Sequence, residues 1–184
     1  MNNKVLDNTI IMGIDPGTNI TGYGIIKIKK NNIELIDLVE FKLSKKNDHS
    51  IKLSEIFNKT SELIKIYSPN YVAIESPFFG KNVQSMLKLG RAQGVSMAAA
   101  LNLDIPITEY SPKKIKMAIT GNGNSSKEQV AKMLKTMLDI KEMPKNLDST
   151  DGLAAAVCHY FNFGNSSSKK EFSNWASYIS KNPD

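Results

Sequence analysis

Cysteine is almost absent from the sequence. Cys158 is the single cysteine in 184 residues, so the chain can form neither an internal disulfide nor a zinc site built from cysteines. Long apolar runs are absent too: no stretch of about 18 apolar residues occurs, which excludes a transmembrane helix. The first ten residues contain no apolar block followed by a small-residue cleavage site, so we expect no secretory signal and a cytoplasmic protein.

Acidic residues are scarce in the middle of the chain. The whole sequence has 24 Lys and Arg against 18 Asp and Glu, a net charge of +6, and residues 76–135 contain nine basic but only three acidic residues. Such a segment suits a polyanion such as nucleic acid. A solvated lysine-rich surface explains the same pattern, and on charge alone it is the simpler interpretation. With 41% apolar and 23% charged residues, the chain is otherwise typical of a folded globular protein.

The apolar pattern predicts an α/β fold. Three strands are expected first, at 10–15, 21–29 and 33–43, with Asn31 and Asn32 in the turn before the third. Two later strands, at 71–75 and 105–110, alternate with helices at 50–67 and 82–102. Three more helices should follow. The first is expected at 112–119, the second directly after a capping box formed by residues 125–128, and the third at 148–163. This order predicts a mixed five-stranded sheet covered by helices, in a domain over 1–163 with a loosely ordered tail over 164–184.

Four acidic residues stand at the ends of predicted elements. Asp15 ends the first strand and Glu75 the fourth, and the carboxyl ends of adjacent parallel strands line the ligand crevice of an open sheet. Asp148 and Asp151 are three residues apart at the start of the last helix, so they share one face. If these acids converge, their repulsion favours a divalent cation, and oxygen ligands with an open shell select Mg²⁺ or Mn²⁺.

Each acid also has an ordinary structural explanation. Asp15 precedes Pro-Gly and could simply be a turn residue, while Asp148 could be a helix N-cap. Asp151 could serve only the helix dipole. Glu75 is harder to explain in this way, because an unpaired carboxylate at the end of a buried strand costs several kcal/mol. The combination of the four is therefore more specific than any one of them.

Six blocks of the sequence resemble, in order, those of RuvC-type Holliday junction resolvases. They are Ile-Asp-Pro-Gly-Thr-Asn-Ile-Thr-Gly-Tyr-Gly at 14–24, Ile-Glu-Ser-Pro-Phe-Phe-Gly-Lys-Asn at 74–82, Leu-Lys-Leu-Gly at 87–90, Lys-Met-Ala-Ile-Thr-Gly-Asn-Gly at 116–123, Lys-Glu-Gln-Val at 127–130 and Asp-Ser-Thr-Asp-Gly-Leu-Ala-Ala-Ala-Val-Cys-His at 148–159. Each block alone is a weak signal, but six in the family's order are specific.

The resemblance implies an RNase H-like fold with helices on both faces of the sheet. It also implies a homodimeric, metal-dependent endonuclease of recombination and repair that cuts four-way DNA junctions, with a branch-migration helicase as partner. It places the catalytic, metal-binding carboxylates at Asp15, Glu75, Asp148 and Asp151. We expect two Mg²⁺ or Mn²⁺ ions per subunit, about 3.5–4 Å apart and bridged by Asp15.

The same resemblance implies several residues that contact DNA. Lys116 and Lys127 match lysines near the cleaved phosphate, where Lys127 would help catalysis by neutralising charge. Phe78 would stack on a base near the junction point, although core packing is the alternative. Other basic residues of the same segment are expected to bind DNA: Lys81, Lys88, Arg91 and Lys113. The helix over 82–102, with its two glycines, matches the region of dimer contact.

Two positions depart from the family pattern. In the block Gly-Arg-Ala-Gln-Gly at 90–94, the basic residue stands two positions earlier than usual. Gly152 stands where Ala is common, at an expected cost of about 1 kcal/mol in helix propensity. We expect these departures to affect the DNA groove rather than the chemistry.

Two other functions fit part of the sequence. The Asp-Pro-Gly-Thr segment at 15–18 also resembles the first phosphate loop of sugar kinases and actin-like ATPases, but this chain is too short to supply their second lobe. A junction-binding protein without catalysis is disfavoured only because all four acids are present.

Overall fold

The computed structural model describes residues 7–29, 32–44, 48–77, 82–142, 144 and 147–163. The predicted tail over 164–184 lies outside them. The elements follow the predicted order: β1 (Ile10–Asp15), β2 (Ile20–Lys29), β3 (Asn32–Lys42), α1 (His49–Tyr67), β4 (Tyr71–Glu75), α2 (Val83–Leu101), β5 (Ile107–Tyr110), α3 (Pro112–Thr120), α4 (Lys127–Met137) and α5 (Asp148–Phe163). No helix in these ranges is long and apolar enough to cross a membrane.

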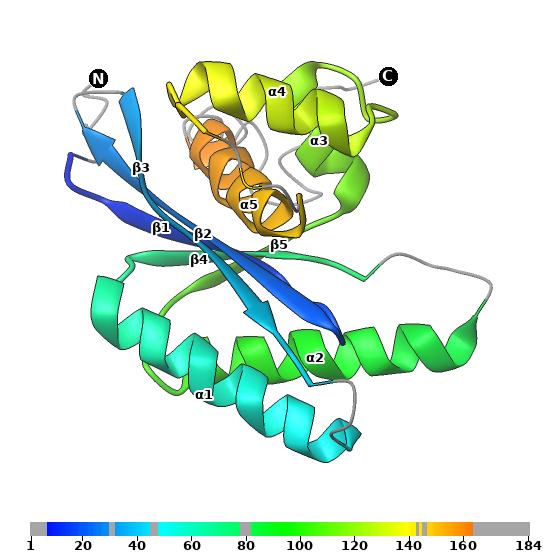
Figure 1. Ribbon diagram of the computed structural model, residues 1–184. Coiled ribbons are helices and arrows are strands. Elements are labelled where there is room, and N and C mark those ends of the chain that lie inside the picture. Colours follow the sequence, from blue (N-terminus) through cyan, green and yellow to red (C-terminus); the bar gives the residue numbers. More distant parts are fainter. Residues whose placement is uncertain are drawn as a thin grey trace, which may run out of the picture.

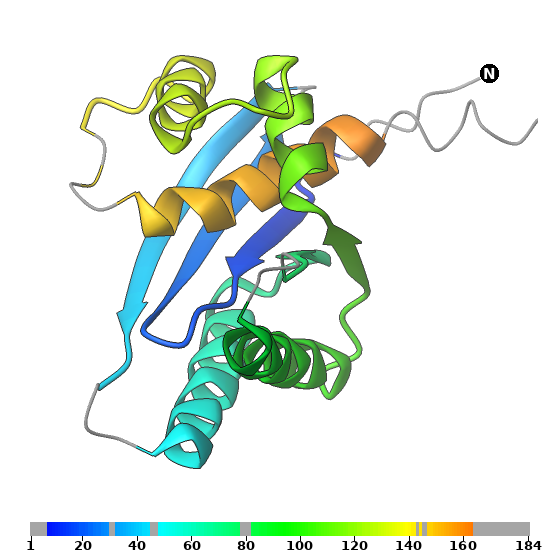
Figure 2. The same ribbon diagram turned by 90° about the vertical axis from the view of Figure 1, so that its right-hand side faces the viewer.

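The strands form one mixed sheet in the order β3-β2-β1-β4-β5. β2 runs antiparallel to both β1 and β3, whereas β1, β4 and β5 are parallel. α1 and α2 cover one face of the sheet, and α3, α4 and α5 cover the other (Figures 1 and 2). The prediction of a mixed five-stranded sheet with helices on both faces is therefore confirmed.

Side chains of the central strands alternate between two cores, as a pleated strand requires. Met12 and Ile14 of β1 are fully buried on the side of α1 and α2, where they pack in one cluster with Leu63. Ile11 belongs to the second core, on the side of α5, together with Val157. β1 is thus buried on both faces and holds its last residue, Asp15, at a fixed position.

Helix α5 approaches the sheet so closely that only glycines fit between them. A Cβ atom at Gly22 or Gly24 of β2 would overlap the backbone of Asp148 or Leu153, respectively. On the helix itself, a Cβ at Gly152 would lie 2.5 Å from the carbonyl oxygen of Gly22. Gly152 is therefore a packing requirement of this chain. An effect of Gly152 on the DNA groove stays a prediction.

Two local predictions were displaced by one residue. The capping box of α4 is formed by Ser126 and Gln129, because the Ser126 hydroxyl accepts from the Gln129 amide and the Gln129 side chain accepts from the Ser126 amide. Ser125, which we expected as the cap, shares a 2.8 Å hydrogen bond with the Thr120 hydroxyl. Asn32 belongs to β3, where it pairs with Lys29, and not to the preceding turn.

We predict that Gly152→Ala lowers the stability of the protein. Helix propensity alone favours Ala over Gly by about 1 kcal/mol, but overlap with the Gly22 carbonyl should cost about 1–3 kcal/mol. Urea unfolding of wild type and variant measures the difference. A gain in the free energy of unfolding would show that the helix can move away from β2 without cost.

Candidate active site

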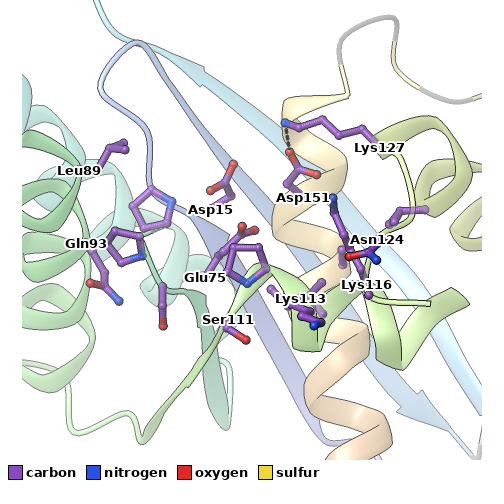
Figure 3. Close-up of a pocket in the computed structure, with 18 residues that line it drawn as sticks. Asp15, Glu75, Leu89, Gln93, Ser111, Lys113, Lys116, Asn124, Lys127 and Asp151 are labelled. Carbon is purple, nitrogen blue, oxygen red and sulfur yellow. Dashed lines mark hydrogen bonds and ion pairs between the residues drawn. The ribbon is translucent and has the colours of Figure 1, made fainter. Parts of the chain in front are cut away.

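Two strand ends bring Asp15 and Glu75 together. β1 and β4 are adjacent and parallel, with Ile14 opposite Ile74, so the next residue of each strand lies at the same edge of the sheet. Both carboxylates line a cavity of about 600 Å³ and point into it (Figure 3). The sequence led us to expect the two acids to meet if these strands were parallel neighbours, and the structure shows that they are.

Helix α5, which packs on one face of the sheet, contributes two further acids. Asp148 and Asp151 lie in its first turn, and the glycine contact with β2 fixes this turn over the end of β1. Asp151 lines the cavity and its side chain is 16% exposed. Asp148 does not line the cavity and its side chain is 37% exposed. Both acids form ion pairs with Lys127, at 3.6 Å for Asp148.

Lys127 is the first residue of α4, where a positive charge is unfavourable because it adds to the positive end of the helix dipole. The neighbouring acids compensate for this. Burial alone lowers the pKa of the Lys127 ammonium, but the hydrogen bond to Asp151 and the charges of Asp151, Asp15 and Asp148 more than reverse it. The pKa is therefore raised, and Lys127 stays charged at the mouth of the cavity.

The two strand-end acids are costly to ionise. Burial, the charge of Asp151 and, less strongly, that of Asp148 raise the pKa of Asp15 to about 7, although Lys127 opposes them. Burial and the charges of Asp15 and Asp151 raise the pKa of Glu75 to about 8, against the opposing charges of Lys127 and Lys116. Burial also raises the pKa of Asp151, although its hydrogen bond to Lys127 lowers it. These carboxyl groups therefore keep their protons to a higher pH than free carboxyl groups do.

These acids suit a hard divalent cation by their chemistry. All four offer carboxylate oxygens, the donors that Mg²⁺ and Mn²⁺ prefer. As the side chains lie, the described residues contain no group of three acidic, His or Cys side chains already gathered as metal ligands. Lys127 donates a hydrogen bond to Asp151 and supplies a positive charge beside this carboxylate. Burial and neighbouring acids raise the pKa of Asp15 and Glu75, so ionising both carboxylates is unfavourable, and a bound cation would offset that cost.

The residues predicted to contact DNA fall into three groups. Lys113, Lys116 and Lys127 line the cavity (Figure 3). Lys88 and Arg91 do not line it and are exposed on α2. The pKa of His49, at the start of α1, is lowered mainly by burial and, less strongly, by the charges of Arg91 and Lys88. Phe78 and Lys81 lie outside the described residues, so their expected contacts with DNA stay predictions.

Sequence reasoning missed four polar residues of the cavity wall: Ser76, Gln93, Ser111 and Asn124. Gln93 is buried on α2, and its side-chain amide donates a 2.7 Å hydrogen bond to Glu109 on β5. The only sequence signal was a glutamine on the apolar side of a predicted helix. Nothing in the sequence indicated that Glu109 would be its partner.

The sheet order and the acidic cavity define the class of the protein. A mixed five-stranded sheet with acids at the ends of two central parallel strands and on a crossing helix is an RNase H-like fold with a nuclease-type site. Residues 11–159 match the family model described as "Crossover junction endodeoxyribonuclease RuvC". The chain belongs to this family.

Known proteins resemble it over nearly their whole lengths. Proteins named crossover junction endodeoxyribonuclease RuvC from Christiangramia forsetii and Cytophaga hutchinsonii are 60% and 56% identical to it, covering 95% and 98% of this chain and 91% and 89% of theirs. The solved structure of T. thermophilus RuvC in complex with a Holliday junction substrate is 27% identical. It superimposes with a TM-score of 0.77, over 85% of this chain and 96% of that one. The matches give no support to the phosphotransferase alternative.

We predict that Asp15→Asn stabilises the protein at pH 8 in the absence of divalent metal. Because the pKa of Asp15 is raised on folding, the folded chain keeps a proton that the unfolded chain loses above about pH 4, so the stability contributed by this group falls as the pH rises towards about 7. The neutral amide avoids this loss. At pH 8 the gain should be about 1–2 kcal/mol, or roughly 3–6 °C in Tm, and near pH 4 it should vanish.

Thermal unfolding in EDTA at both pH values measures this effect. Glu62→Gln, an exposed acid of α1 paired with Lys59, serves as the control and should change the Tm little at either pH. A loss of stability in Asp15→Asn at pH 8 would mean that the ionised carboxylate is well compensated without metal.

Proposed function

We propose that this chain resolves four-way DNA junctions by divalent-metal-dependent hydrolysis of phosphodiester bonds. The observation that carries the proposal is the cavity in which Asp15, Glu75 and Asp151 face a wall of lysines. Acids able to hold cations and lysines able to bind phosphate are what cleavage of a nucleic-acid backbone requires. Membership of the RuvC family and the junction named with the T. thermophilus structure support DNA junctions as the substrate.

Asp15, Glu75, Asp148 and Asp151 are the residues that would hold the metal, and we propose two Mg²⁺ ions, with Mn²⁺ able to replace them. When bound, such ions activate water for in-line attack and stabilise the leaving 3′ oxygen. The chain contributes the rigid placement of the acids by two strand ends and one helix. Asp148 is the more exposed of the two helix acids and does not line the cavity, and we propose it as the fourth metal ligand.

Lys127 and Lys116 would bind the phosphate that is cut. In the free protein Lys127 is bonded to Asp151, and Lys116 lines the cavity beside it. If a cation takes over the charge of Asp151, the Lys127 ammonium is released at the cavity mouth, where a phosphate oxygen can replace the carboxylate. A lysine ammonium is protonated at neutral pH, so the released Lys127 would carry the positive charge that this role requires.

We also propose a homodimer, because a four-way junction has two-fold symmetry and a two-fold dimer presents one site to each of two strands. Gly90 and Gly94 leave α2 open to such a contact: a Cβ atom at either position would meet nothing within 4 Å. We further propose a branch-migration helicase as a partner, contacts of Lys88 and Arg91 with DNA, and a cytoplasmic location.

We predict that Asp15→Asn abolishes cleavage of a synthetic four-way junction but retains binding to it. The variant loses a metal ligand, whereas removing a negative charge does not weaken attraction to DNA. Gel analysis in Mg²⁺ measures cleavage, and a gel shift in EDTA measures binding. Glu62→Gln changes a residue of α1 that does not line the cavity, and it should cleave normally.

The same assay separates the alternatives. Wild type that shifts the junction but never cuts it in Mg²⁺ or Mn²⁺ would be a binding protein without catalysis. Cleavage that continues in EDTA would contradict a metal-dependent mechanism.

We predict that Lys127→Ala slows cleavage and reduces the salt dependence of junction binding. Each phosphate contact contributes about 0.9 to the slope of log K against log salt, so one contact should be missing. Lys59→Ala removes a lysine of the opposite helix layer and should leave the slope unchanged. An unchanged slope in Lys127→Ala would show that this lysine does not touch phosphate.

A further inference from the structure

A second hollow lies away from the acidic cavity, between the edge strand β3 and the end of α5. This β3–α5 groove, which the end of α4 and the residues after it also line, has a volume of about 930 Å³. Its lining is mainly apolar: Ile33, Leu35, Met137, Leu138, Ile140, Tyr160 and Phe161. All seven are partly buried and pack on the core beneath. β3 is an outer strand of the sheet, so the groove adjoins a strand edge, where apolar surface promotes association with other chains.

The chain itself continues from this groove. Tyr160 and Phe161 belong to the last turn of α5, which ends at Phe163, and 21 further residues follow outside the described part. Phe172 is nine residues beyond Phe163, which allows a reach of roughly 30 Å when extended. A segment that leaves the helix within one turn of the groove needs only a fraction of that distance.

The composition of this segment matches the groove. Phe172, Trp175, Tyr178 and Ile179 are spaced as one face of a helix, in a segment that is otherwise polar. The groove also has two acids, Glu34 and Asp139, against one basic residue, Lys141, and a pair of lysines at 169–170 precedes Phe172.

We propose that the β3–α5 groove is the docking site of the chain's own C-terminal segment, residues 164–184. The aromatic side chains at 172, 175 and 178 fill the apolar groove, and the segment covers the hollow beside the edge of β3. Tethering favours the chain's own segment over any free partner, because a short link gives an effective concentration in the millimolar range. Weak contacts are therefore enough to hold it.

Trp175 reports on this docking, since it is the single tryptophan of the chain. In the full-length protein its fluorescence should be blue-shifted and protected from acrylamide quenching compared with the urea-unfolded protein. Leu35→Lys and Leu138→Lys each place a charge in the groove and should shift the emission towards that of the unfolded chain. Ile36→Lys changes the next residue of β3, which is 40% exposed and does not line the groove, and should leave the emission unchanged.

Circular dichroism confirms that each variant is folded before its fluorescence is compared, and the two groove variants make the test independent of either one alone. Wild-type emission equal to that of the unfolded chain would overturn the proposal. So would blue-shifted emission that neither folded groove variant changes.

A mixing experiment separates the chain's own segment from that of a second copy. Trp175→Phe protein has an intact groove but no fluorophore, and Leu35→Lys protein has the fluorophore but a disrupted groove. Their mixture should show only the red-shifted emission of Leu35→Lys. Recovery of blue-shifted emission on mixing would show that the groove takes the segment of a partner copy and would overturn the assignment to the same chain.

Discussion

Helix α5 lies directly on the backbone of β1 and β2, and the acidic cavity depends on that close approach. Gly22 and Gly24 on the strand and Gly152 on the helix leave no room for a Cβ atom between them. The first turn of the helix is thereby held above the end of β1, so that Asp151 and Asp15 line the same cavity. Larger residues in this contact would lift the helix and separate the acids, although none of the acids would have changed.

The acids that this packing brings together repel one another. Burial and neighbouring negative charge raise the pKa of Asp15 and of Glu75, and Lys127 offsets the repulsion only in part. The core beneath supplies the stability that this arrangement costs, since β1 is buried on both faces. Carboxyl groups held on a rigid sheet are positioned for cations more precisely than groups on a flexible loop would be.

Much of this arrangement could be predicted from the sequence. The apolar runs indicated the strands, and the placement of Asp15 and Glu75 at the ends of two of them indicated their proximity, which the parallel register of β1 and β4 produces. Contacts between distant elements carried no such signal: the Gln93–Glu109 hydrogen bond and the overlap of Gly152 with Gly22 depend on tertiary packing. The capping box was misplaced by one residue because Ser125 and Ser126 are both suitable caps. Positive charge alone could not tell that Lys88 and Arg91 lie outside the cavity.

If acids from two strands and one helix act as one cation site, each of them contributes to the same binding. Titration with Mn²⁺, followed by electron paramagnetic resonance of the free ion, measures this binding. We expect wild type to take up Mn²⁺, and Asp15→Asn, Glu75→Gln and Asp151→Asn each to weaken that uptake. Undiminished uptake in these three variants would show instead that the ion is held elsewhere on the chain.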